Sequence, residues 1–255
     1  MTLTDAELYE TADLFGVDLD QVRRDHVISH VLAAISSECR DSFLFIGGTM
    51  LSRTWLTDVR LSEDIDLIAR RPRAAAGAEL AAALATEMAG DFGGLVWDKD
   101  PPRARDAEPI FLNVGDDVTI KFQLLDSTGR GAWPSELRAI HQRYSGAPPA
   151  QLHVPSGAAS VAMKLTAWVD RRAARDLYDL YAMAQRGMIS VEATRLYAAH
   201  GQSTRPFQRH IFENPPSDTQ WEDELGHQCR LTVTAAEAIA AVGTTLEGIG
   251  AISSS

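Results

Sequence analysis

Residues 43–69 read FLFIGGTMLSRTWLTDVRLSEDIDLIA and hold the most informative pattern in the chain. The opening run FLFI is short, apolar and ends in Gly47 and Gly48, which predicts a buried strand that leads into a tight turn. A short helix is expected next, with Thr49 as its N-cap. The segment DIDLIA, residues 64–69, predicts a second strand. The stretch therefore predicts a unit of strand, turn, helix and strand.

Helical and β-rich segments surround this unit. Apolar residues recur at helical spacing over 3–15 and 22–39, and residues 74–90 form an alanine-rich helical pattern. Three β-rich segments follow, GGLVWD, IFLNVG and VTIKFQLL, and the sheet is expected to end near Leu125. From Pro149 the pattern is helical again, in SGAASVAMKLTAWVDRR, ARDLYDLYAMAQRG and TAAEAIAAVGTTLEGIG.

This order of elements predicts an α+β protein with two lobes. Residues 1–148 are expected to form a lobe of N-terminal helices and a small mixed sheet, and residues 149–255 a helical lobe that completes the active site. At 255 residues the chain is long enough to divide in this way. Residues 201–228 show no pattern that assigns them to a helix or a strand.

The composition is that of a globular protein, with 45% hydrophobic and 23% charged residues, which excludes a disordered chain or a fibre. No apolar run approaches the roughly 18 residues of a membrane helix. The N-terminus is acidic, so we expect a cytoplasmic protein without a membrane partner. Cys39 and Cys229 are far apart in sequence and lack metal-ligand spacing, which predicts buried thiols.

The net charge restricts contact with nucleic acids. The 24 Lys and Arg residues against 35 Asp and Glu residues give a charge of −11, which repels a phosphate backbone over most of the surface. Any RNA must therefore meet a local basic patch. Three basic clusters are candidates, although solvated surface charge is the commoner explanation of each one. They are Arg70, Arg71 and Arg73; Arg103 and Arg105; and Lys164, Arg171, Arg172 and Arg175.

Asp64 and Asp66 alternate with apolar residues in the second strand, so both carboxylates face one side of it. Two adjacent like charges near a core require a cation. Mg²⁺ suits them because it is commonly held by one or two carboxylates together with substrate phosphates. The alternative is an exposed pair on an edge strand.

Gly47 and Gly48 lie directly before the predicted helix. Their missing side chains allow backbone N–H groups to approach a phosphate, and a helix N-terminus favours its charge. A tight turn without a ligand is the alternative. With Thr49 and the acidic strand so close in sequence, we expect one site for a nucleoside triphosphate.

The segments GGTMLSRTW and RLSEDIDL resemble the nucleotidyltransferase motif of the AbiEii/AbiGii toxin family, which includes MenT-like toxins of type IV-like toxin–antitoxin systems. The resemblance continues in KLTAWVDRRAARDLYDL, and is close over residues 43–68 and 161–180. It implies a polymerase-beta-like nucleotidyltransferase fold. It also implies an enzyme in which Asp64 and Asp66 bind Mg²⁺, or Mn²⁺, and a nucleoside triphosphate is the substrate.

The same resemblance assigns the later residues. Lys164 would match the lysine that contacts the triphosphate, although a helix lysine extending to solvent is the alternative. Asp176 would match a later functional acid, while Asp179 caps the helix or pairs with Arg175. In one continuous helix Asp176 would point about 120° away from Lys164, so we expect a break over residues 172–174.

One position departs from the pattern of related enzymes that extend a hydroxyl group. The strand VTIKFQLL carries Gln123 where a third carboxylate is expected, and glutamine cannot act as a base. Three explanations stay open: Asp126, Asp116 or Asp117 is the base, the two aspartates act with Asp176, or the metal alone lowers the pKa of the hydroxyl.

Ser62 precedes Asp64 by two residues, and its hydroxyl is expected to position the triphosphate or to start the strand as a turn residue. A phosphate on Ser62 would add negative charge beside both aspartates and switch the enzyme off.

The resemblance implies a toxin that transfers nucleotides to the 3′ end of tRNA, which blocks aminoacylation and translation, and that has a cognate antitoxin. Arg171, Arg172 and Arg175 are the expected contacts to the RNA backbone. The alternatives are transfer to a protein or small-molecule acceptor, which suits the acidic surface, and an inactive module that binds a nucleotide or an antitoxin.

Overall fold

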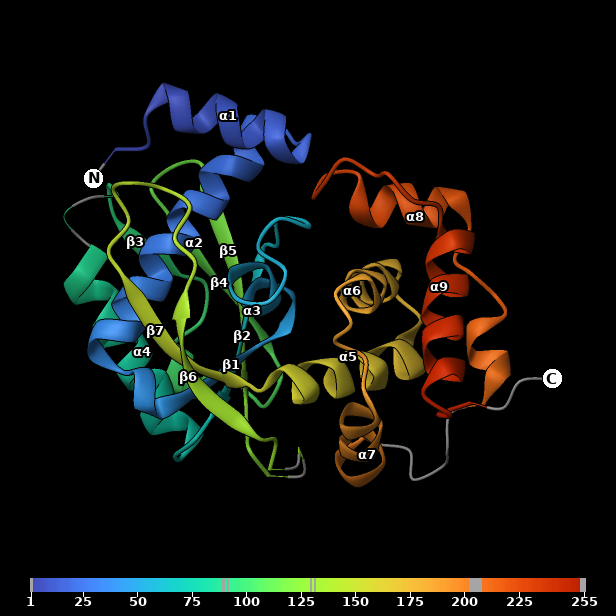
Figure 1. Cartoon of the computed structure of the whole chain (residues 1–255). Coiled ribbons are helices and arrows are strands. Elements are labelled where there is room, and N and C mark those ends of the chain that lie inside the picture. Colours follow the sequence, from blue (N-terminus) through green and yellow to red (C-terminus); the bar gives the residue numbers. More distant parts are fainter. Residues whose placement is uncertain are drawn as a thin grey trace. The chain divides into compact units, whose positions relative to one another are not determined.

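A computed structural model of the chain describes residues 2–88, 90, 92–128, 130, 132–201 and 208–252. The chain divides into two compact units, and each is described by itself. The sheet unit comprises residues 1–130 and 135–154, and the helical unit comprises residues 131–134 and 155–255. Helices and a mixed sheet are both present, as the α+β prediction requires (Figure 1).

The sheet unit contains a five-stranded sheet of order β1-β2-β5-β4-β3. β2 and β5 are parallel, whereas every other neighbouring pair is antiparallel. The strands are β1 (Phe43–Ile46), β2 (Asp64–Ala69), β3 (Leu95–Trp97), β4 (Pro109–Val114) and β5 (Val118–Leu125). All five fall on segments that the sequence predicts as strands.

A second sheet lies beyond the expected end of the β-region. It pairs β6 (Ser135–Ile140) with β7 (Ala150–Pro155). Most residues of β6 are exposed, so its sequence SELRAI lacks the apolar alternation that marks a strand. The sheet unit ends at Val154, and the helical unit continues from Pro155.

Helices cover the apolar face of the five-stranded sheet. α2 and α4 contact each other and β5, over buried residues that include Ile65, Leu67 and Phe122 (Figure 1). On the opposite face, Asp64 and Asp66 are only half-buried. The helices of this unit are α1 (Asp5–Phe15), α2 (Leu19–Glu38), α3 (Gly47–Arg53) and α4 (Arg73–Met88), with 3₁₀ turns η1 (Arg40–Ser42) and η2 (Pro101–Arg103).

A buried charge network joins three segments of the sheet unit. Asp25, on α2, is fully buried, and its Oδ1 forms an ion pair at 2.8 Å with Nη2 of Arg53, the last residue of α3, which also donates to the Asp25 carbonyl at 2.8 Å. Between β6 and β7, Arg143 approaches the same carboxylate at 3.5 Å and the Tyr144 hydroxyl donates to it at 2.9 Å. Buried charges persist only when they are paired and hydrogen-bonded, so this network holds α3 against α2.

The helical unit contains α5 (Gly157–Arg171), α6 (Ala174–Gln185), α7 (Val191–His200), η3 (Arg209–Phe212), α8 (Asp218–Leu225) and α9 (Ala235–Gly248). The sequence predicts α5, α6 and α9, and misses α7 and α8. α5 contacts α6 and α7, while α8 and α9 contact α6 (Figure 1). Arg172 adopts a left-handed conformation, φ 54°, between α5 and α6, so the predicted break is present.

The two cysteines and the lengths of the described helices bear on two further predictions. Cys39 and Cys229 are both buried free thiols, and burial raises the pKa of Cys39 to about 12. None of the helices described is both long and apolar enough to cross a bilayer.

Candidate nucleotide and metal site

Asp64 and Asp66 project from the same face of β2. Ile65 and Leu67, which alternate with them, are buried on the other face. β2 pairs with β5 in a register that sets Asp64 opposite Lys121 and Asp66 opposite Gln123. The pleat of the strand therefore produces the carboxylate pair that the sequence predicts.

A cation already contacts one of these carboxylates. Lys121 Nζ lies 2.8 Å from Asp64 Oδ2, and both side chains are about one-third exposed. The sequence analysis missed this lysine, although its alternation with Ile120 and Phe122 in β5 signals that it faces the same side as the aspartates. The contact shows that a positive charge can lie beside the Asp64 carboxylate on this face of the sheet.

The donor set suits Mg²⁺ shared with a substrate. Two carboxylates on one strand leave most of an octahedral shell to water and phosphate oxygens, as is usual for this ion. In the described part of the chain, no group of three or more His, Cys, Asp or Glu residues could hold a metal. The residues present therefore fit a metal that arrives with a triphosphate, and not a closed structural site.

Gly47 supports the second aspartate. Its backbone has φ +84°, a conformation that favours glycine, and an added Cβ would lie only 2.3 Å from Asp66 Oδ2. The Asp66 carboxylate thus packs directly on the backbone of the turn. Glycine is required at this position for the backbone conformation and for the close approach.

The helix begins earlier than the sequence predicts. α3 starts at Gly47 with Ile46 as N-cap, so Thr49 lies inside the helix and is not its cap. The Thr49 hydroxyl instead donates to the carbonyl oxygen of Asp64. The threonine therefore ties α3 to the start of β2, a tertiary role that the local pattern does not reveal.

Arg60 is a buried cation at the glycine turn that the sequence analysis overlooked. It is 2% exposed, donates through Nη1 to the carbonyl of Leu61 at 3.1 Å, and lies so near Gly48 that an added Cβ would meet Nη2 at 2.6 Å. The Ser62 hydroxyl lies on the same side, 2.9 Å from that Cβ position. Ser62 is buried, so a phosphate could be attached to it only if the turn opens.

Lys164 is held by two acids in the helical unit. Its Nζ lies 2.9 Å from Asp176 Oδ1 and 2.7 Å from Asp179 Oδ2. The lysine is 7% exposed, so it does not extend into solvent. Asp179 pairs with Lys164, whereas Arg175 is the partner that the sequence predicts for it. Burial raises the pKa of Asp176, but Lys164 and Arg171 outweigh burial and hold that pKa well below its usual range.

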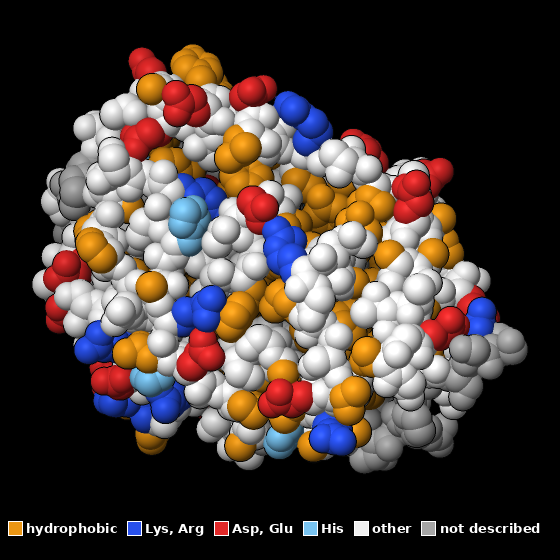
Figure 2. All heavy atoms as spheres, viewed as in Figure 1, with side chains coloured by type: hydrophobic (Ala, Val, Ile, Leu, Met, Phe, Trp, Pro, Cys, Tyr) orange, Lys and Arg blue, Asp and Glu red, His pale blue; other side chains and the backbone are white. Residues whose placement is uncertain are grey.

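The three arginines that are expected to contact the RNA backbone have different surroundings. Arg171 donates to Asp176 at 2.7 and 3.0 Å, with half of its side chain exposed. Arg172 donates to the carbonyl of Ile211 and lies over the Trp168 ring, while Arg175 is half-buried. On the face drawn in Figure 2, the described basic side chains are interspersed with acidic ones.

The proposed substitutes for the missing third carboxylate lie away from Asp66. Gln123 lies opposite Asp66 and donates to the carbonyl of Ala107 at 3.1 Å. Asp117 is six residues before Gln123 along β5, about 20 Å at strand spacing, and Asp116 is farther still. Asp126, just beyond β5, pairs with Arg73 at 3.4 Å. None of the three acids adjoins the carboxylate pair.

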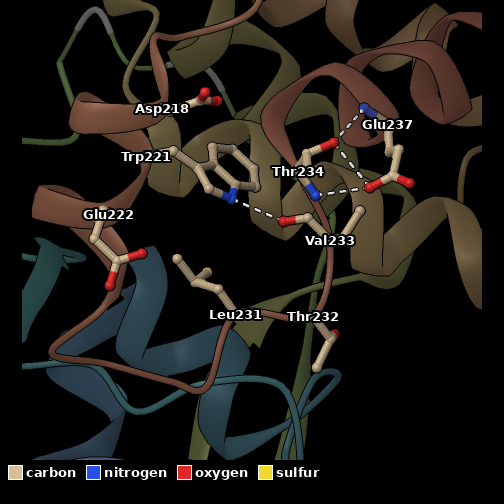
Figure 3. Close-up of a pocket in the computed structure, with 8 residues that line it drawn as sticks. All are labelled: Asp218, Trp221, Glu222, Leu231, Thr232, Val233, Thr234 and Glu237. Atoms are coloured by element: carbon tan, nitrogen blue, oxygen red, sulfur yellow. Dashed lines mark hydrogen bonds between the residues drawn. The ribbon is translucent and has the colours of Figure 1, made fainter.

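A pocket of about 360 Å³ lies in the helical unit, around α8 and the start of α9 (Figure 3). Its lining includes a buried tryptophan, two aliphatic residues and three exposed acids: Trp221, Leu231, Val233, Asp218, Glu222 and Glu237. The indole nitrogen of Trp221 donates to the Val233 carbonyl at 2.9 Å. The three carboxylates give this pocket a negative charge, which disfavours a bare phosphate.

Comparison with known proteins identifies the fold and the family. One similar solved structure is MenT4, a nucleotidyltransferase toxin of Mycobacterium tuberculosis H37Rv, with a TM-score of 0.72 and 23% identity over 98% of this chain and 90% of that one. The likeness confirms the nucleotidyltransferase fold. Among curated proteins, none matches the chain. The family model for the nucleotidyl transferase AbiEii toxin of type IV toxin–antitoxin systems matches residues 30–242. The chain therefore belongs to the AbiEii nucleotidyltransferase toxin family.

Proposed function

We propose that this protein transfers a nucleotidyl group from a nucleoside triphosphate to the 3′ hydroxyl of tRNA, with release of pyrophosphate, and thereby blocks aminoacylation and translation. The observation that carries the chemistry is the pair Asp64 and Asp66 on one face of β2, with the Asp66 carboxylate packed on the Gly47 backbone. A rigid carboxylate pair beside a glycine turn suits a metal bound together with phosphates.

Asp64 and Asp66 would hold Mg²⁺, or Mn²⁺. A bound ion would supply positive charge to the phosphates and to the attacking hydroxyl. Lys121 would leave Asp64 or remain beside it as a further positive charge, since the side chain is one-third exposed. The carboxylate pair itself needs no movement, because β2 and Gly47 already fix its geometry.

The turn would receive the phosphates. Gly47 and Gly48 offer backbone without side chains, and Arg60 adds a buried positive charge against Gly48. Thr49 and Ser62 are proposed to position the triphosphate around the turn. Lys164 is proposed to contact the triphosphate as a point charge, with Asp176 and Asp179 orienting its ammonium group.

No side chain needs to act as general base. Gln123 occupies the register position opposite Asp66, and its amide cannot take a proton. Asp176 is a poor base because its pKa is held low by Lys164 and Arg171. The acceptor hydroxyl would therefore lose its proton to solvent, with Asp64 and Asp66 holding the metal that would favour this loss.

The proposed contacts to the acceptor are basic residues of the helical unit. Arg171, Arg172 and Arg175 are proposed to contact the RNA backbone, although Arg171 and Arg172 already bind partners within the helical unit. The net charge of −11 favours a second candidate, transfer to a protein hydroxyl or a small molecule. A toxin of this family also implies a cognate antitoxin.

The test incubates the protein with total tRNA, Mg²⁺ and each labelled nucleoside triphosphate in turn. Asp66→Asn removes one carboxylate charge from the site, so we expect label on tRNA from the wild type and at least a hundredfold less from the variant. Glu63→Gln is the matched control, because Glu63 adjoins Asp64 in sequence but pairs with Arg24 at 3.2 Å.

The same reaction in a cell lysate, separated into RNA, protein and small molecules, distinguishes the acceptors. Label confined to protein or small molecules would overturn the tRNA acceptor and leave the transferase chemistry. Triphosphate binding without label on any fraction would instead indicate an inactive binding module.

A further inference from the structure

The sheet face that carries the aspartates continues across two more strands. β4 alternates strictly, with Pro109, Phe111 and Asn113 exposed and the residues between them buried. Phe111 is 36% exposed, which is unusual for so large an apolar side chain. An exposed aromatic residue on a functional face is a candidate for ligand contact.

The strand register aligns this phenylalanine with the aspartate pair. Asp64 lies opposite Lys121, and Lys121 lies opposite Phe111. Directly opposed residues share a face of the sheet, so the three side chains form one row across β2, β5 and β4. Neighbouring strands are about 4.8 Å apart, so the Phe111 backbone lies about 10 Å from that of Asp64.

The neighbours of Phe111 suit a nucleotide. Lys121 supplies a positive charge opposite Phe111, and in the next row along the same strands the Thr119 hydroxyl donates to Asn113 Oδ1 at 2.8 Å. On the β3 side the Asp98 carboxylate accepts the backbone N–H of Phe111 at 2.6 Å, which partly offsets its negative charge. Single-stranded nucleic acids are commonly bound by an aromatic ring that stacks on a base, beside a positive charge that meets the backbone. The row supplies the aromatic ring of Phe111 and the positive charge of Lys121. It begins at Asp64, one of the two carboxylates beside which the acceptor hydroxyl would react.

We propose that Phe111 stacks on the 3′-terminal base of the RNA acceptor. The inference rests on the proposed function, and it locates the acceptor on the β4 side of the aspartates. Because every base has a π-face, Phe111 would strengthen binding without selecting the base. It is a substrate-binding residue with no part in the chemical step.

The experiment measures equilibrium binding of a short single-stranded oligoribonucleotide with the 3′-terminal sequence of tRNA to the full chain. Phe111→Ala should weaken binding roughly 5- to 100-fold, the range expected for one lost stacking contact. Phe111→Tyr keeps the ring and should bind within about twofold of the wild type. Leu137→Ala is the matched control, since Leu137 is 48% exposed on β6, outside the five-stranded sheet, and should bind as the wild type does.

Triphosphate binding and thermal unfolding of each variant separate the outcomes. Weaker oligoribonucleotide binding by Phe111→Ala alone, with triphosphate binding and unfolding unchanged, supports the inference. Wild-type affinity in Phe111→Ala overturns it, and so does equal weakening in Leu137→Ala. If the wild type labels tRNA while Phe111→Ala retains its KM for tRNA, the inference fails and the proposed function stands. If the wild type labels only protein or small molecules, both fail.

Discussion

At the scale of single residues, Gly47 links backbone geometry to the chemistry of the site. Its positive φ and its contact with Asp66 both exclude a Cβ. We predict that Gly47→Ala destabilises the fold by about 1–2 kcal/mol through backbone strain, and lowers kcat roughly a hundredfold because the carboxylate must shift. Chemical denaturation and nucleotide-transfer kinetics measure the two effects.

The variant Gly187→Ala separates the effect of backbone strain from the effect of a steric clash with a neighbouring side chain. Gly187 also has a positive φ, +65°, but nothing lies within 4 Å of an added Cβ. The substitution should cost similar stability and leave transfer unchanged. If both alanine variants retained full activity, the close approach of Gly47 to Asp66 would have no catalytic importance.

At the scale of elements, the network around Asp25 joins α2 to α3 and so supports the glycine turn at the other end of α3. We predict that Asp25→Ala lowers the free energy of unfolding by about 3–5 kcal/mol, because Arg53 would be left as a buried, uncompensated charge. Urea denaturation provides the measurement.

The control for this prediction lies on the same helix. Asp20 pairs with Arg23 at 2.6 Å, but its side chain is 85% exposed. Asp20→Ala should therefore change stability by at most about 1 kcal/mol. Equal losses in the two variants would contradict a special role for the buried network.

At the scale of the whole molecule, stability should depend on pH through His26. Burial, followed by the neighbouring His30, lowers the pKa of His26 to about 4, whereas an unfolded histidine has a pKa of about 6.5. The unfolded state therefore binds more protons between these values, and the free energy of unfolding falls as pH drops from 6.5 to 4, by roughly 3 kcal/mol at most.

Urea denaturation over this pH range tests the sign and the source of the effect. In His26→Gln the slope between pH 6.5 and 4 should be much smaller, because the titrating group is absent. The Asp176 contribution lies at lower pH, because its depressed pKa keeps it charged until well below pH 4. An unchanged slope in His26→Gln would assign the pH dependence to other groups.

Several features of the site could be predicted from the sequence because they depend on local periods. Alternation in DIDLIA places Asp64 and Asp66 on one face, and the spacing from Lys164 to Asp176 requires a break, which occurs at Arg172. The N-cap of α3 lies three residues before the predicted one, at Ile46 and not at Thr49, because Thr49 resembles a cap but bonds to Asp64 across the fold.

The sequence by itself determined the five strands of the main sheet, three of the helices in the helical unit and the carboxylate pair, since a period of 2 or 3.6 residues records which side chains are buried. Only the tertiary structure brought Lys121 to Asp64, 57 residues away in sequence, Arg143 to Asp25, 118 residues away, and Phe111 into the same row as the aspartates. The reason is physical: strand register and the packing of distant elements choose these partners, and a local pattern contains no information about either.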